Sequence, residues 1–233
     1  MIWLGIDTAN TPLAVALVKD GQVLANEVTN IKLNHSGGAM LAIERLLTRV
    51  KLTAQDIDAV AVSEGPGSYT GIRIGVTIAK TLAWTLNKPL VGVSSLKMLA
   101  ANAAMYNGIV CTLIDARRQN VYAGAFDAAN GFENVVEDHH YSIADLIEKL
   151  DSLNAPVLFV GHDVDTFWDV IVETLGERAV RAPYTIDLPD AAQLIYLAEK
   201  MPQLTGDAVH NFVPQYRRLA EAEANWIKEQ KNK

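Results

Sequence analysis

The chain lacks most features that mark secreted, membrane-bound or disulfide-stapled proteins. Cys111 is the single cysteine among 233 residues, so no internal disulfide can form, and its place in an apolar run predicts a buried thiol. No apolar run reaches the roughly 18 residues that cross a bilayer, and the first residues lack the basic segment of a signal peptide. We therefore expect a cytoplasmic protein without membrane contact.

Basic charge is also scarce. Lys and Arg number 20 against 27 Asp and Glu, which gives a net charge of -7. A protein that binds nucleic acid on its own usually carries a basic face, so nucleic acid is expected to meet this chain only within a complex. Small basic spots occur at Arg117 with Arg118, at Arg217 with Arg218, and at Lys228, Lys231 and Lys233. Solvated surface is the default interpretation, and a patch that contacts tRNA is the alternative.

Motifs for metal, phosphate or nucleophilic chemistry are missing as well. The histidines include no H-E-x-x-H and no pair at i and i+4, so no metal site is predicted. The glycine-rich segment 63–75 matches neither G-x-x-x-x-G-K-[ST] nor G-x-G-x-x-G. Ser68 stands one place too early for a nucleophile elbow. No catalytic residue is therefore predicted.

What the sequence does contain is a repeated pattern of strand, aspartate, turn and strand. An apolar run over residues 2–6 ends at Asp7, and a similar run over residues 109–114 ends at Asp115. Because strands alternate with helical patterns around both, we expect an α/β fold of two related halves with mixed sheets. The halves are predicted at residues 1–104 and 105–233, and the fold allows the last helix, expected after Leu219, to pack on the first half.

The remaining elements follow from local patterns. Further strands are expected from apolar, β-prone runs at residues 13–18, 22–28, 57–63, 90–93, 121–126 and 156–160. Helices are expected from apolar spacing and capping residues at residues 39–50, 69–86, 95–104, 143–150, 164–175 and 190–200.

The helix over residues 69–86 carries an unusual stripe of small residues. Gly71, Gly75 and Ala79 recur at i, i+4 and i+8, so one face is nearly bare backbone. Two glycines inside a helix cost roughly 1 kcal/mol each relative to alanine, and close approach of another helix is the usual compensation. The stripe therefore indicates contact with a helix of this chain or of a partner, and wholly internal packing is the alternative.

Asp7 and Asp115 each stand at the end of a predicted strand. An acidic residue at each strand end, facing a shared cleft, is how actin-like kinases and ATPases hold Mg²⁺ and phosphate. In those proteins the turns beside the aspartates are rich in glycine, which lets phosphate approach the backbone. Here Asp7 is followed by Thr8 and Asp115 by Ala116, without a glycine in either turn. We expect no required cofactor and no ATP hydrolysis, and at most weak ATP or ADP binding at Asp7, Thr8 and Asp115. Turn capping is the alternative role of Asp7.

Several segments together resemble the bacterial TsaB family, also called YeaZ. The most specific is residues 63–75, Ser-Glu-Gly-Pro-Gly-Ser-Tyr-Thr-Gly-Ile-Arg-Ile-Gly. Residues 4–8, residues 115–118 with Val121 and Tyr122, and residues 214–217 with 221–223 support it. The resemblance implies the two-lobed actin/Hsp70/sugar-kinase fold over nearly the whole chain.

The resemblance also implies a noncatalytic partner subunit. The family acts with a catalytic sister subunit, TsaD, and a small ATPase, TsaE, to place threonylcarbamoyl on N6 of adenosine 37 in tRNAs that read ANN codons. TsaD carries a metal-binding histidine pair, whereas here His35 is followed at i+4 by Ala39. The implied contacts are TsaD, TsaE, tRNA through the complex and a second copy in an isolated homodimer.

Two helices of the first half form the partner interface in that family. They map here to residues 40–47 and 70–82. The interface residues that the resemblance implies are Met40, Ile43, Leu47, Gly71, Ile74, Gly75, Ile78 and Leu82. The rival hypothesis is a stand-alone small-molecule kinase or ATPase of the same fold, which would need the glycine-rich phosphate turns that this chain lacks.

Overall fold

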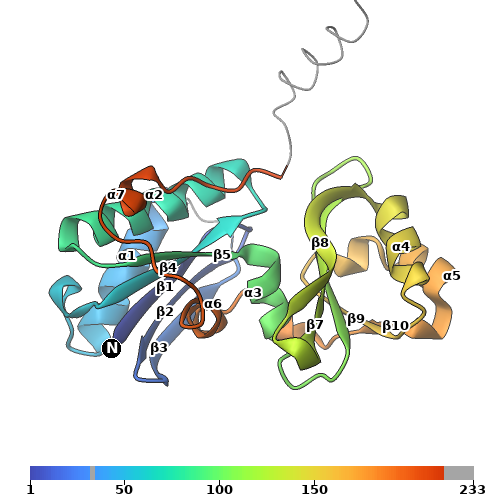
Figure 1. Cartoon of the computed structure of the whole chain (residues 1–233), viewed down its shortest axis with the longest axis horizontal. Helices are drawn as coiled ribbons and strands as arrows, with labels where there is room; N and C mark the ends of the chain where they lie inside the picture. Colours follow the sequence, from blue (N-terminus) through green and yellow to red (C-terminus); the bar gives the residue numbers. More distant parts are fainter. Residues whose placement is uncertain (32–34, 218–233) are drawn as a thin grey trace, which may run out of the picture.

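The structure is a computed structural model that describes residues 1–31 and 35–217. The helix predicted after Leu219 lies outside the described residues. The chain forms two lobes, each built on a five-stranded sheet (Figure 1).

The first sheet has the order β3-β2-β1-β4-β5. Its strands are β1 (Ile2–Asp7), β2 (Leu13–Lys19), β3 (Gln22–Thr29), β4 (Ala59–Gly65) and β5 (Leu90–Ser94). The central strand β1 runs antiparallel to β2 and parallel to β4. β1 and β4 are almost entirely buried, as expected for apolar strands that are covered on both faces.

Helices cover both faces of this sheet, and alternate strand residues face them. Leu4 and Val60 pack in the cluster formed with α1 (His35–Arg49) and α2 (Tyr69–Leu86). Trp3 and Ala61 pack instead in the cluster formed with α3 (Ser95–Ala101) and α6 (Ala191–Ala198). Because successive strand residues point to opposite faces of the sheet, α1 and α2 cover one face and α3 and α6 cover the other.

The second sheet repeats this topology with the order β10-β9-β6-β7-β8. Its strands are β6 (Ile109–Asp115), β7 (Asn120–Asp127), β8 (Glu133–Ser142), β9 (Val157–Val160) and β10 (Ala179–Arg181). β6 runs antiparallel to β7 and parallel to β9, as β1 does with β2 and β4. The predicted two-lobed α/β fold with duplicated mixed sheets is confirmed.

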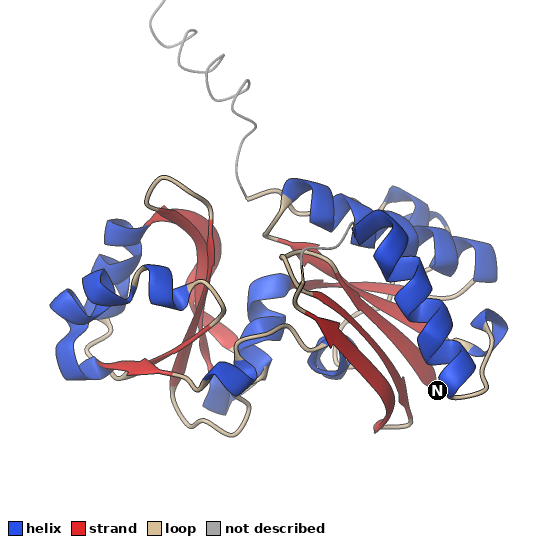
Figure 2. Ribbon diagram, turned by 180° about the vertical axis from the view of Figure 1, so that it is seen from behind, coloured by secondary structure: helices blue, strands red, loops and turns tan. Residues whose placement is uncertain are grey.

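The lobes share one apolar core at their junction. One cluster of buried side chains joins Trp3 of the first sheet and Phe126 of the second with residues of α3 and α6. The hydroxyl of Thr112 in β6 also donates to the carbonyl of Leu96 in α3, at 3.0 Å. Figure 2 shows α3 in the space between the two sheets. The junction is therefore packed protein and not a bare hinge.

The last described part of the chain returns to the first lobe. α6 packs on β1 and β2, and α7 (Asp207–Asn211) packs on α2. The Nζ of Lys80 in α2 donates to the carbonyl of Phe212 at 2.9 Å. In the sequence, the strands of the first sheet thus come before residue 104 and those of the second sheet after it, while residues 191–212 pack on the first lobe.

Four elements differ from the expected pattern. β8, β10 and α7 were not expected. The helix expected at residues 164–175 is divided into a short 3₁₀ turn (Val164–Thr166) and α5 (Trp168–Leu175). α4 (Ile143–Ser152) begins at Ser142, whose hydroxyl accepts the N–H of Asp145, as its capping sequence predicts. Other single 3₁₀ turns lie at Ala54–Asp56, Ala128–Asn130, Gly176–Arg178 and Tyr184–Ile186.

Candidate functional site

The glycine stripe of α2 packs against the turn between β1 and β2. A Cβ on Gly71 would lie 2.1 Å from the backbone oxygen of Thr8, and one on Gly75 would lie 2.4 Å from Thr8 Oγ1. The Thr8 hydroxyl, which is buried, donates to the carbonyl of Gly71 at 2.7 Å. Only glycine allows this approach, so the stripe is explained by contacts within the chain.

The interpretation of Gly71 and Gly75 as a surface for a partner helix is therefore wrong. Both glycines are buried, as is Ala79. The element that covers the two glycines is a strand-to-strand turn of the same chain and not a helix. Wholly internal packing, the alternative, describes these residues.

The glycine-rich loop before α2 closes the same turn from the other side. A Cβ on Gly67 would lie 2.2 Å from the carbonyl oxygen of Ala9, and the N–H of Ser68 donates to that oxygen at 2.7 Å. The Ser68 hydroxyl accepts the N–H of Gly71 at 3.3 Å and so caps α2. The Ser68 N–H, which an anion site at this helix start would use, is therefore taken up by protein.

Asp7 lies inside the first lobe. Its side chain is completely buried, and the N–H of Ala9 donates to Oδ1 at 3.1 Å, which is the turn-capping geometry. Burial raises the pKa of Asp7 to about 6. Asp7 and Thr8 are absent from the cleft wall, so the predicted nucleotide set of Asp7, Thr8 and Asp115 is not brought together; Asp115 alone lines the cleft.

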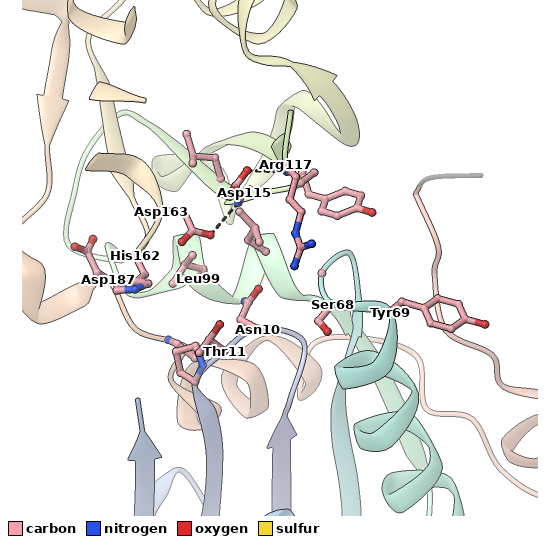
Figure 3. A pocket seen from close by; sticks show the side chains of 17 residues that line it. Asn10, Thr11, Ser68, Tyr69, Leu99, Asp115, Arg117, His162, Asp163 and Asp187 are labelled. Atoms are coloured by element: carbon pink, nitrogen blue, oxygen red, sulfur yellow. Dashed lines mark hydrogen bonds between the residues drawn. The ribbon is translucent and has the colours of Figure 1, made fainter. Parts of the chain in front are cut away.

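That cleft lies between the lobes and has a volume of about 520 Å³ (Figure 3). The first lobe supplies polar side chains of the β1–β2 turn and of the start of α2, and the second supplies the ends of β6 and β9. The main polar groups are Asn10, Thr11, Ser68, Asp115, Arg117, His162 and Asp163.

Sequence reasoning missed Asn10, His162 and Asp163. A signal existed for Asp163, because it follows β9, a parallel neighbour of β6, and parallel strands end at a common edge. Asp163 Oδ2 accepts the backbone N–H of Asp115 at 2.8 Å. Among the described residues, no group of three or more potential metal ligands is found, and the side chain of His35 lies outside the described part.

A second candidate surface lies along α1 and α2 and holds two separate hollows. One is lined by α1, residues 52–57 and Leu82, and the other by residues 69–78 of α2 alone. The two hollows together are called the α1–α2 groove. Met40 and Leu41 are about half exposed on its rim, and Ile78 and Leu82 are partly exposed beside them. Ile74 is also partly exposed on α2, whereas Ile43 and Leu47 are buried and form the floor. The groove is thus lined mainly by apolar side chains of the two helices that the resemblance implicates.

Comparisons with known proteins agree with this architecture. The family model described as TsaD, tRNA N6-adenosine threonylcarbamoyltransferase, matches residues 22–226. The chain is 43% identical over 232 residues to the tRNA threonylcarbamoyladenosine biosynthesis protein TsaB of Bacillus subtilis (strain 168), which covers 99% of this chain and 100% of that one. The chain belongs to the TsaB family.

Other TsaB relatives extend the match. The TsaB of Escherichia coli (strain K12) is 40% identical over 199 residues, 82% of this chain and 86% of its own. A crystal structure from Pseudomonas aeruginosa, described as similar to peptidase YeaZ, superposes with a TM-score of 0.78 at 26% identity, over 93% of this chain and 99% of that chain. The fold of the TsaB family is thus shared.

The TsaB family is also related to the transferases themselves. The tRNA N6-adenosine threonylcarbamoyltransferase of Bacillus subtilis (strain 168) is 38% identical over 109 residues, which is 40% of this chain and 32% of that protein.

No helix in the described part of this TsaB chain is both long and apolar enough to cross a membrane.

Proposed function

We propose that this chain is the noncatalytic partner subunit of a tRNA N6-threonylcarbamoyladenosine transferase. Its partners are the catalytic TsaD protein and the TsaE ATPase in the cytoplasm, and tRNA is met through the complex. The chain needs no cofactor of its own, and any ATP or ADP binding is weak. The observation that carries this proposal is the open apolar α1–α2 groove, in a chain related in sequence to the transferases.

The groove has the character of a protein interface. Met40 is 44% and Leu41 55% exposed at successive positions of α1, and Ile78 and Leu82 continue the apolar surface on α2. Contiguous exposed apolar side chains of this kind are typical of surfaces that contact another protein. In this proposal a homodimer and a TsaD heterodimer both form through these two helices.

The rival function, a stand-alone kinase or ATPase, is not supported by the first lobe. The turn that would hold phosphate is filled by Thr8 against Gly71 and by Gly67 against Ala9. Asp7 is buried behind that turn and cannot contact a metal–phosphate complex without rearrangement of the loop. The catalytic geometry of such a kinase is therefore missing on this side of the cleft.

The proposal is tested by binding to the TsaD protein of the same organism. Ile78→Arg places a charge at the groove, and we expect about a 100-fold loss of affinity in calorimetry, because an unpaired charge is buried at the contact. Val170→Arg is the matched control, since Val170 is 41% exposed on α5 of the other lobe. Gly75 is unsuitable as a probe, because any side chain there meets Thr8.

Reconstitution of tRNA modification supplies the second arm. We expect threonylcarbamoyladenosine only when TsaD, TsaE and this chain are all present, and a much lower yield with Ile78→Arg than with Val170→Arg. Formation of the product by this chain alone would refute the noncatalytic assignment. ATP turnover by the purified chain would favour the rival function.

A further inference from the structure

The interlobe cleft presents acceptors that are held in place by the backbone. The N–H of Asp115 donates to Asp163 Oδ2 at 2.8 Å, and the N–H of Arg117 donates to Asp115 Oδ1 at 2.7 Å. Each carboxylate thus keeps one oxygen that these bonds do not use. Across the cleft, Asn10 Oδ1 is shielded from solvent and has no hydrogen-bond partner among the described residues. The free carboxylate oxygens are available to N–H or O–H donors of a ligand.

The same cleft presents one guanidinium, that of Arg117, on a tightly held turn. Residues Arg117, Arg118 and Gln119 all have positive φ angles of 55–66°, a left-handed turn that costs non-glycine residues energy at each position. Asn120 Nδ2 donates to the carbonyls of Arg117 and Arg118, and the N–H of Ile143 donates to that of Gln119, which holds the turn. A strained, over-determined turn of this kind is a reason to look for a function.

The turn delivers Arg117 into the cleft. In Figure 3 its guanidinium extends from the second lobe toward Asn10 and Ser68 of the first. Its side chain has no hydrogen-bond or ion-pair partner in the described part of the chain. Asp187, which also lines the cleft, is already paired with Arg181 at 2.8 Å. One free guanidinium therefore faces two carboxylates that have no paired cation.

This charge pattern disfavours polyphosphates and simple metal ions. Two unpaired carboxylates against one guanidinium give a negative cleft, which repels a nucleotide tail. The turn of the first lobe that would cradle phosphate is closed by Gly67 and Ala9. The described residues offer no third ligand for a metal ion. A ligand with both charges in one small molecule matches the cleft better.

We propose that the interlobe cleft binds a small zwitterion, a free α-amino acid. Its carboxylate pairs with the Arg117 guanidinium, and its ammonium group donates to Asp115 and Asp163. Leu99, Leu113 and Thr11 on the cleft wall accommodate a small aliphatic or hydroxylated side chain. This proposal goes beyond the partner role, because the site is complete within one chain.

The test is an NMR titration of the full ¹⁵N-labelled chain with L-threonine, which has a small side chain with one methyl and one hydroxyl. We expect saturable shifts at the cleft amides of Arg117, Asp163 and Ser68. Threonine methyl ester lacks the carboxylate and N-acetyl-threonine lacks the ammonium group, so each should bind about 10-fold more weakly or worse, the loss expected for one charge-assisted contact. Mg²⁺-ATP serves as the competing ligand.

Variants of the chain test which residues contact the carboxylate and the ammonium group of the ligand. Arg117→Gln should weaken threonine binding by about 10-fold, whereas Arg118→Gln, the same change in the same turn but outside the cleft wall, should leave it unchanged. Asp163→Asn should affect the unmodified ligand more than the N-acetyl form. Circular dichroism checks folding, and the ligand series on the parent chain decides the question if a variant fails to fold.

The proposal is overturned by no saturation with threonine, by equal binding of either blocked form, or by binding of Mg²⁺-ATP alone. An equal loss in both arginine variants would also overturn it. None of these measurements includes the TsaD protein, so failure here is distinguishable from failure of the partner role.

Discussion

The contact between Thr8 and α2 makes the effect of a helix substitution depend on a distant residue. At an ordinary helix position Gly75→Ala would stabilise the fold by roughly 1 kcal/mol. Here the new Cβ would lie 2.4 Å from Thr8 Oγ1. Thr8 must then turn away and lose its 2.7 Å bond to Gly71. Overpacking of about 1–3 kcal/mol and the lost buried hydrogen bond of about 1 kcal/mol outweigh the gain, for a net loss of about 1–3 kcal/mol.

Thr8→Ala reverses the sign of this effect. Without Oγ1, the added methyl of Gly75→Ala meets the Cβ of residue 8 and Val62 Cγ2, both at 3.7 Å, which is ordinary contact. In that background we expect Gly75→Ala to stabilise by up to about 1 kcal/mol. The coupling between the two positions is then about 1–4 kcal/mol, above the roughly 0.5 kcal/mol expected for independent sites.

The assay is urea unfolding of the four chains of this double-mutant cycle at one pH. Gly37→Ala is the matched control, because Gly37 lies in α1 and an added Cβ there has no atom within 4 Å. It should change stability equally with and without Thr8→Ala. If Gly75→Ala has the same effect in both backgrounds, within about 0.5 kcal/mol, the packing of Thr8 on the glycine stripe is refuted.

Two further predictions concern buried carboxylates. Burial raises the pKa of Asp7 to about 6, whereas in the unfolded chain Asp7 loses its proton near pH 4. The folded chain therefore binds one proton more between these values, and the free energy of unfolding falls as pH rises from about 4 to 6. The free energy of unfolding of Asp7→Asn, relative to that of the parent, should therefore rise by about 1–3 kcal/mol between pH 4 and pH 7. If urea unfolding gives the same pH dependence for both chains, this prediction is wrong. Asp187 is buried against Arg181, so Asp187→Ala should lower stability by about 3 kcal/mol. Asp165 pairs with the same arginine at an exposed position, so Asp165→Ala should cost less than about 1 kcal/mol. Thermal unfolding measures both, and equal losses would contradict the difference in burial.

The duplicated sheets could be predicted because their signal is local. The apolar runs that end at Asp7 and Asp115 are central strands buried on both faces, which leaves a continuous pattern in the sequence. β8 gave no such signal. It is an edge strand with one buried residue, Val136, and its exposed side chains include Glu133, Glu137 and His139. Its position is fixed by pairing with β7 and not by an apolar period.

The glycine stripe shows the opposite limit. Gly71 and Gly75 correctly indicate that something approaches the helix closely, but spacing along one helix cannot identify the neighbour. That neighbour is Thr8, which the parallel pairing of β1 with β4 brings beside the start of α2. The same topology turns Asp7 inward while Asp115 remains exposed. Equivalent positions in a duplicated sequence thus acquire different roles through packing.

The shared core at the junction bears on which function the fold can serve. Kinases of two-lobed folds close their lobes around the substrate, which requires a junction that can move. Here such motion would disturb a core that includes Trp3 and Phe126, both nearly inaccessible to solvent. It would also disturb the bond from Asn102 Nδ2 to the carbonyl of Leu188, at 2.7 Å. A fixed junction suits a subunit that presents the α1–α2 groove in one orientation, and it leaves the interlobe cleft open to a ligand small enough to enter without closure.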